Sequence, residues 1–214
     1  MKRALLLLAV LLLAAKFAAL SIEPYGDSVY DLASGVTTLP QGGVIHDNEN
    51  DLSIDASYIE YKEGEYIKAK QAKVDTEDAQ FGTAELEYLP ETDRALLKGG
   101  VGFDGKNIHK LHAERGWIYL KDGVAVLAGN VAAAEPQLTA ALLVADYRQG
   151  EALLVAPYAF KDPKLGVTLS GKNPKKPLYL KFDAKTGAVS ASSKVPAAVV
   201  ERLLAYVDKA QSAK

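Results

Sequence analysis

The chain has 214 residues, of which 49% are hydrophobic, and a chain of this length can bury one substantial core. Its formal net charge of −2 gives no sign of the basic surface that nucleic-acid binding requires. It contains no cysteine, which excludes disulfides, thiolate metal sites, a cysteine nucleophile and a lipid-modified N-terminal cysteine. One domain without covalent staples is therefore expected.

The N-terminus is typical of an export signal. Lys2 and Arg3 precede an unbroken apolar run over 4–15, which matches the n-region and h-region of a secretory signal. Because a membrane-spanning helix needs about 20 apolar residues, this run is short for one. Extending it over 4–20 keeps a second interpretation open, an anchor in the inner membrane that faces the periplasm. We predict that 1–21 is a signal peptide or signal anchor and that the domain is exported to the periplasm.

From Tyr30 onward the sequence repeats itself. Each copy has a tyrosine that ends one alternating run, a polar turn, a second alternating run, and then a small residue and a valine. The clearest copy is 113–131, Ala-Glu-Arg-Gly-Trp-Ile-Tyr-Leu-Lys-Asp-Gly-Val-Ala-Val-Leu-Ala-Gly-Asn-Val. The tyrosines that mark the copies lie 27 to 32 residues apart, at Tyr30, Tyr61, Tyr88, Tyr119, Tyr147 and Tyr179. A period in this range indicates a repeat architecture.

The runs on both sides of each turn have the period of β-strands. Before the turns, apolar and acidic residues alternate, which predicts strands with one dry and one wet face. The predicted dry face holds Ile59, Tyr61, Leu86, Tyr88, Trp117, Tyr119, Ala145 and Tyr147, and the predicted wet face holds Glu60, Glu87 and Asp146. After the turns, Leu97 shares a face with Val101, and Leu127 with Val131. Roughly twelve strands in one long sheet are expected from about six such units.

The flanks of the repeats have other patterns. We expect a connector over 22–28, a polar loop over 46–51, and a loop over 171–177, whose two prolines and three lysines do not suit a central strand. Apolar residues at helical spacing over 196–211 predict an amphipathic helix that plugs one end of the sheet stack. The domain bounds are therefore 22–195 for the repeats and 196–214 for the helix and tail.

The repeat resembles the OstA-like repeat of lipopolysaccharide-transport proteins of the LptA and LptC type. The resemblance covers about 30–172 and is carried by the motif Ala-Glu…Tyr, polar turn, Leu-x-Gly-Asn-Val. It is sharpest over 113–131 and 84–101, where Gly100 replaces the asparagine, and after Tyr147 it is weaker, because Ala156-Pro157 replaces Gly-Asn. It implies an all-β, V-shaped β-jellyroll whose apolar interior holds acyl chains and whose end strands pair with neighbouring jellyrolls.

We therefore predict an all-β, OstA-like β-jellyroll with a C-terminal amphipathic helix. The lipid groove is predicted to be lined by Ile59, Tyr61, Ile67, Leu86, Tyr88, Leu97, Val101, Trp117, Tyr119, Leu127, Val131, Tyr147 and Leu154. Small residues on the apolar side, such as Ala69 and Ala125, are compatible with room for a ligand and equally with two closely packed sheets. From the residues alone, both interpretations stay open.

Strand edges are the predicted contact surfaces for partners. An unpaired edge accepts another strand, so 30–45 at one end, and 165–169 or 179–182 at the other, are expected to pair with other jellyroll transport proteins. The C-terminal helix is expected to cover the last edge. Lys172, Lys175 and Lys176 form a basic tip that either meets lipid phosphates or is a solvated loop.

Motifs for an enzyme, a metal or a cofactor are absent from the sequence. The stretch 166–172 resembles a phosphate loop, but Asn173 stands where that loop needs serine or threonine. His109 and His112 have no nearby third ligand in the sequence, and no Gly-x-Ser-x-Gly motif occurs. The predicted function is non-enzymatic binding of an envelope lipid or lipopolysaccharide and its transport between inner and outer membrane. The alternative is a structural envelope scaffold with a solid-packed core.

Overall fold

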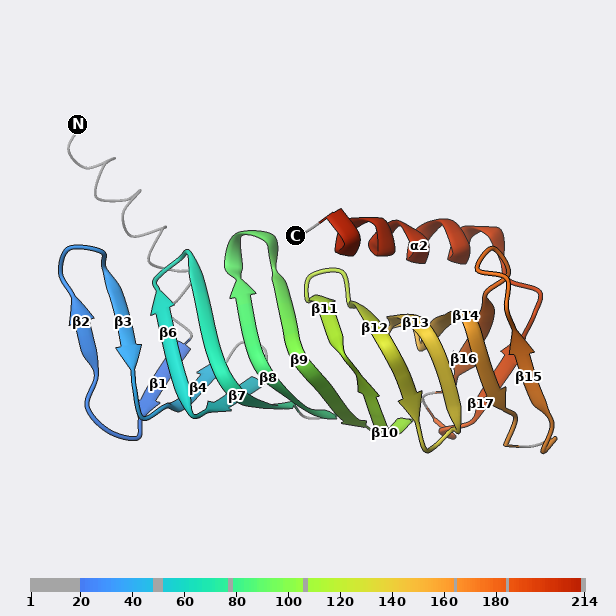
Figure 1. The fold of residues 1–214 in the computed structure, drawn as a ribbon, viewed down its shortest axis with the longest axis horizontal. Helices are drawn as coiled ribbons and strands as arrows, with labels where there is room; N and C mark the ends of the chain where they lie inside the picture. The colour runs from blue at the N-terminus through green and yellow to red at the C-terminus, as the bar shows by residue number, and fades with distance from the viewer. Residues whose placement is uncertain are drawn as a thin grey trace.

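The computed structural model describes residues 20–47, 52–76, 79–105, 108–163, 165–183 and 185–212. The predicted signal segment lies outside these ranges up to residue 19. Within the described ranges, 17 strands form one antiparallel sheet, and Figure 1 shows helix α2 (Ala197–Ser212) lying crosswise over it. The prediction of an all-β jellyroll with a C-terminal helix is confirmed.

The first strands are β1 (Leu20–Pro24), β2 (Val29–Asp31), β3 (Val36–Leu39), β4 (Gly43–Asp47), β5 (Leu52–Ala56), β6 (Tyr58–Lys62), β7 (Tyr66–Thr76) and β8 (Ala79–Leu89). They are followed by the 3-10 turn η1 (Pro90–Thr92), β9 (Arg94–Gly105), β10 (Ile108–Ala113), β11 (Arg115–Tyr119), β12 (Val124–Ala133) and β13 (Leu138–Asp146). The last strands are β14 (Glu151–Lys161), β15 (Thr168–Gly171), β16 (Leu178–Phe182) and β17 (Val189–Ser192).

The repeat predicted from the tyrosines is a hairpin in every copy. Each marker tyrosine lies either in the turn of its hairpin or in the strand before that turn. The turns join β2 to β3, β6 to β7, β8 to β9, β11 to β12, β13 to β14, and β16 to β17. Most of these turns end on a glycine with positive φ, such as Gly64 at +77° and Gly123 at +71°. Only glycine adopts this conformation without steric cost, which explains its recurrence in the sequence.

The strand registers divide the sheet into two leaves. The first leaf runs β2, β3, β6, β7, β8, β9, β11, β12, β13, β14, β16, β17. The second leaf runs β1, β4, β5, β7, β8, β9, β10, β12, β13, β14, β15. The long strands belong to both leaves, so the sheet folds across them. The expected number of twelve strands is too low, because some stretches predicted as one strand are interrupted and form two. Examples are β5 and β6, which are separated at Ser57, and β10 and β11, which are separated at Glu114.

The Gly-Asn end of the repeat is the place where the sheet bends. Between Ala128 and Val131, strand β12 has one residue more than its partner β13, and Gly129 and Asn130 in this bulge have φ of +80° and +47°. The side chain of Asn130 donates a hydrogen bond of 2.6 Å to the carboxylate of Glu114, at the break between β10 and β11. Bulges increase local twist and bend a strand. The bend therefore explains why this copy has Glu114 before β11 and Asn130 in β12.

Two other copies have a bulge at the corresponding position. β9 carries an extra residue at Gly99-Gly100, opposite Thr83 and Glu85 of β8, and β14 carries one at Ala156-Pro157, opposite β13. These are the dipeptides that replace Gly-Asn in the sequence. The three bulges lie on the long strands β9, β12 and β14, so the bends form a line along the array.

Replacing Gly129 by alanine is expected to lower the free energy of unfolding by about 2 kcal/mol, since it combines a positive φ with a steric conflict. A Cβ at this position would lie 2.2 Å from Oε2 and 2.9 Å from Cβ of Glu114. Gly64 is the matched control, because its φ is also positive but a Cβ there meets nothing within 4 Å. Urea unfolding measures both variants. Equal losses would contradict a special role of the bulge at Gly129.

Apolar side chains form two clusters, one between the leaves and one outside the first leaf. The inner cluster takes residues from both leaves, and the outer cluster lies between the first leaf and α2. Val199 and Leu203 of α2 pack in the outer cluster with Trp117, Val126 and Val144, among others. The predicted helix is confirmed, but its predicted place is wrong. It covers the outer face of β11–β14, because that face is apolar, instead of plugging an end of the stack.

Two predictions about the flanks are also wrong. The expected connector 22–28 contains most of β1, whose residues pair with β4 from Leu20↔Asp47 to Pro24↔Gly43. The expected loop 46–51 begins too early, because His46 and Asp47 belong to β4. The remainder of that loop, 48–51, lies outside the described residues.

Candidate functional site

The candidate site is the apolar interior between the two leaves. In the first leaf, one row of cross-strand partners crosses the array on the inner face: Leu39, Ile59, Ala69, Leu86, Leu97, Gly116, Leu127, Leu143, Leu154 and Leu178. In the second leaf, a similar row runs through Ile45, Ile54, Val74, Phe81, Phe103 and Leu111. The interior is thus continuous from one end of the molecule to the other.

Most of the predicted groove residues lie in this interior. Eight are buried in the inner cluster, namely Ile59, Ile67, Leu86, Leu97, Val101, Leu127, Val131 and Leu154. Tyr61 and Tyr88 are partly buried and pack against it. Their burial follows from the alternation of strand side chains, since Lys68 and Lys70 on the other face of β7 are exposed. Whether these residues contact a lipid stays a prediction.

The predicted inner position of Trp117 and Tyr119 is wrong. Both side chains belong to the outer cluster beneath α2, and Gly116 and Ile118 face the interior instead. The reason is the register of β11, in which Gly116 is the cross-strand partner of Leu97 and Leu127 in the inner row, so that Trp117 and Tyr119 point to the other face. The alternation within one strand shows which residues share a face, but the pairing decides which face that is.

Asp146 and Tyr147 also differ from their predicted environments. Tyr147 was predicted on the dry face, but it follows the end of β13, lies in the turn, and is 50% exposed. Asp146 was predicted on the wet face, but only 3% of its surface is exposed. Its face is the outer one, as predicted, and α2 removes that face from water.

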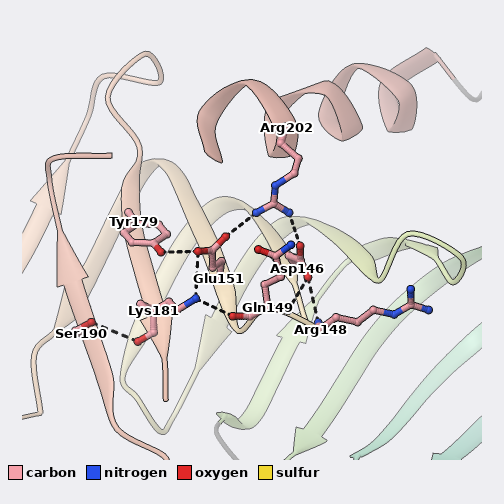
Figure 2. Close-up of polar contacts among 8 residues, drawn as sticks. All are labelled: Asp146, Arg148, Gln149, Glu151, Tyr179, Lys181, Ser190 and Arg202. Carbon is pink, nitrogen blue, oxygen red and sulfur yellow. Dashed lines mark hydrogen bonds and ion pairs between the residues drawn. The ribbon is translucent and has the colours of Figure 1, made fainter. Parts of the chain in front are cut away.

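An ion-pair cluster that the sequence analysis missed attaches α2 to the sheet. Figure 2 shows Arg202 of α2 between Asp146 and Glu151, which are cross-strand partners at the ends of β13 and β14. The guanidinium donates to the carboxylate of Asp146 and, at 2.6 Å, to Glu151. Tyr179 donates to the other oxygen of Glu151 at 2.9 Å, and Lys181 at 3.1 Å. A lone arginine on the apolar side of the predicted helix was the signal available in the sequence.

The cluster changes the protonation of its members. Burial, together with the hydrogen bond to Glu151, raises the pKa of Tyr179 to about 12. Burial acts to raise the pKa of Glu151, but the hydrogen bonds from Tyr179 and Lys181 and the charges of Lys181 and Arg202 outweigh it. The pKa of Glu151 is therefore held below its usual value of 4.5.

This shift predicts that α2 is less firmly attached in acid. Because the folded-state pKa of Glu151 is lowered, its contribution to stability is complete above the unfolded-state pKa near 4.5 and is lost as the pH falls through the folded-state value. Trp117 is the lone tryptophan and lies under α2, so its fluorescence should shift to the red in that range. The Glu151→Gln variant should show a weaker pH dependence. An unchanged pH profile in this variant would contradict the assignment to Glu151.

Among the strands in the described ranges, those at the ends of the array each have one unpaired edge. At one end, β1 and β2 are the outermost strands of the two leaves, and at the other end β15 and β17 are. The prediction of an edge is correct for the start of 30–45 and for 165–169, which overlaps β15. It is wrong for 179–182, because β17 covers β16, and α2 leaves the edge of β17 open because it lies on the face.

Exposed apolar side chains gather at these ends. Tyr25, Val29, Tyr30 and Leu32 are each more than half exposed next to β1 and β2, and Leu165 and Val167 are exposed beside β15. Monomeric proteins rarely expose adjacent apolar side chains at a strand edge without a partner. Both ends are therefore candidate contact surfaces.

Other chemistry is not evident in the part of the chain that the structure describes. Among those residues, no group of three His, Cys, Asp or Glu is placed to hold a metal ion. His109, considered as a metal ligand in the sequence, pairs with Asp104 at 2.6 Å. None of the helices in the described ranges has the length and apolar character to cross a membrane.

Comparison with solved structures gives several similar chains. The chain is similar to LptH of Pseudomonas aeruginosa. That crystal structure is of the LptA homologous periplasmic component of the conserved lipopolysaccharide transport device. The two chains are 10% identical, with a TM-score of 0.38 over 83% of this chain and 95% of LptH. No protein-family model and no curated protein matches the sequence.

Proposed function

We propose that this chain is a non-enzymatic carrier for the apolar part of an envelope lipid or lipopolysaccharide, working in the periplasm between inner and outer membrane. The observation that supports the proposal most directly is the continuous apolar interior between the leaves, from Leu39 to Leu178. Each methylene transferred from water to such an interior gains about 0.8 kcal/mol. A passive carrier needs this shielding and no covalent chemistry.

Transfer to neighbouring proteins would use the open ends of the array. The end with β1 and β2 carries Glu23, Asp27 and Asp31, whereas the end with β15 carries Lys161, Lys172, Lys175 and Lys176. Complementary charge favours a head-to-tail arrangement over pairing of like ends. We propose that other jellyroll transport proteins add strands at these edges, so that the interiors join. The residues at 4–20 would either direct export or anchor the chain in the inner membrane.

The closed state of the interior favours a second candidate function. Ile59, Leu154 and Phe160 have no exposed surface, and their neighbours in the inner cluster are nearly as buried. A solid-packed core of this kind is what a structural envelope scaffold requires. In the carrier, by contrast, the leaves must separate or side chains must move to admit a lipid.

Native mass spectrometry and lipid extraction of the full chain, purified from the source envelope, test the proposal. A co-purifying lipid is expected, and it should be lost in Leu127→Gln, which makes the interior polar. Trp117→Phe is the matched control because Trp117 lies in the same hairpin on the outer face. A folded protein that carries no lipid and ignores added lipid and lipopolysaccharide would reject the carrier and leave the scaffold as the better account.

A further inference from the structure

The charges of the chain are distributed unevenly along the array. The sequence from 159 to 195 has eight lysines and two aspartates, a formal charge of +6, whereas 22–158 has 11 basic and 23 acidic residues, a formal charge of −12. Most of the basic segment belongs to β15, β16, β17 and their loops, which Figure 1 shows at the opposite end of the array from β2 and β3. One end of an otherwise acidic molecule is therefore cationic.

The turn between β14 and β15 exposes two apolar side chains at this end. Leu165 is 73% exposed and Val167 is 49% exposed, and neither belongs to an apolar cluster. The backbone N–H of Asp162 donates to the carbonyl of Val167 at 2.9 Å, and the backbone N–H of Gly166 donates to the carbonyl of Asp162 at 2.9 Å. The N–H of Leu165 donates to the carboxylate of Asp162, also at 2.9 Å. The turn is thus closed by its own hydrogen bonds, with its apolar side chains outside.

Four exposed lysines flank this turn and the loop after β15, namely Lys161, Lys172, Lys175 and Lys176. Within the described ranges, no ion pair involves any of them. The backbone N–H groups of Lys175 and Lys176 donate to the side-chain and main-chain oxygens of Asn173, at 2.9 and 3.0 Å, which closes the loop. Since β15 has four residues, it separates the turn from the loop by only about 13 Å. The apolar and the basic groups therefore share one end of the molecule.

The kinds of residue at this end favour a lipid surface over a protein as the occupant. All basic residues over 159–195 are lysine, whereas protein interfaces are depleted in lysine and enriched in arginine, whose planar guanidinium pairs with carboxylates. A lysine acts as a flexible point charge, which suits the mobile phosphates of anionic phospholipids. An exposed leucine on a turn can enter the boundary between headgroups and acyl chains, where apolar and basic side chains act together.

From these observations we propose that the β15 end is a docking surface for a bilayer that contains anionic phospholipids. Leu165 and Val167 enter the headgroup layer, and the four lysines lie at the lipid phosphates, so that the array extends away from the membrane. The edge of β15 is open at the same end, so a strand-pairing protein and a bilayer compete for it. This inference goes beyond the carrier function, because it does not depend on what the interior holds.

The test uses the full chain and vesicles of phosphatidylglycerol and phosphatidylcholine in equal parts, with brominated acyl chains. The reporter is Leu165→Trp in a Trp117→Phe background, because bromine quenches tryptophan on contact. The matched reporter is Tyr147→Trp in the same background, since Tyr147 is 50% exposed in the turn at the other end of β14. We expect quenching at position 165 and none at position 147. Membrane binding through 1–21 does not produce this difference, because each readout is local to its turn.

Replacing lysines tests the electrostatic part of the proposal. The test variant lacks the three lysines of the loop after β15, through Lys172→Gln, Lys175→Gln and Lys176→Gln. The control loses the same charge from exposed positions of β7 and β9, through Lys68→Gln, Lys70→Gln and Lys98→Gln. Because each lysine near an anionic surface strengthens binding severalfold, the test variant should need at least about tenfold more lipid for half-maximal quenching at position 165. The control should need as much lipid as the reporter protein itself.

Vesicles of brominated phosphatidylcholine alone should quench the reporter at position 165 only weakly, since this lipid has no net charge. Equal quenching by both kinds of vesicle, equal quenching at both positions, or equal losses in the two lysine variants would overturn the docking surface. Absence of quenching at position 165 with every vesicle would also overturn it, and would leave this end to a strand-pairing protein. The carrier function stands or fails separately, on the lipid that native mass spectrometry detects in the interior.

Discussion

Replacing Arg202 by alanine is expected to lower the free energy of unfolding by about 3 kcal/mol, the usual result when one partner of a buried ion pair is removed. The loss comes less from the attraction itself than from Asp146, which is left 3% exposed without its counter-charge. Part of that loss is offset because the backbone N–H groups of Arg148 and Gln149 still donate to the same carboxylate. Urea unfolding followed by Trp117 fluorescence measures the effect.

Arg148→Ala is the matched control for this experiment. Arg148 lies in the turn beside Asp146, is exposed, and donates to the backbone carbonyls of Leu120 and Lys121 instead of a carboxylate. Its removal should cost about 1 kcal/mol. If the two arginine variants lose the same stability, the attachment of α2 is due to the apolar contacts of Val199 and Leu203 alone.

Replacing Phe160 by alanine is expected to have the largest effect of any single change, about 4 kcal/mol. Phe160 is fully buried in the inner cluster, between Leu138 and Leu169 of the neighbouring strands. Truncation leaves a cavity that the strands of the second leaf cannot close without losing their register. Thermal and urea unfolding measure the loss, and Leu165→Ala, at a 73% exposed position of the nearby turn, is the control with little expected change.

The same variant also distinguishes the two candidate functions. In a carrier, the cavity at position 160 should be filled by a bound acyl chain, so that added lysolipid recovers part of the lost stability. In a solid-packed scaffold, lysolipid should leave the unfolding midpoint where it was. A loss below about 1 kcal/mol would show that the interior is loosely packed at this end, contrary to the burial of Phe160.

The faces of individual strands could be predicted only as far as each strand stays straight. Ile59, Leu86 and Leu127 lie where alternation places them, since each belongs to the same uninterrupted run as its marker tyrosine or turn. Trp117 lies on the opposite face, because its neighbour Gly116 is the cross-strand partner of Leu97 and Leu127 in the inner row. The cross-strand pairs of the inner rows could not be predicted either. Phe81 and Phe103, for example, are partners only through the register of β8 with β9, which no local pattern encodes.

By itself, the sequence determined the repeat, the hairpins and the amphipathic helix, because these depend on local spacing: tyrosine before each turn, glycine at the turn, and apolar residues at period two or three to four. Only the tertiary structure decided where the sheet bends, which edges are open and which face α2 covers. These depend on contacts between residues far apart in the chain, such as Glu114 with Asn130 and Arg202 with Asp146. Strand register and packing bring such pairs together, and local sequence patterns do not predict them.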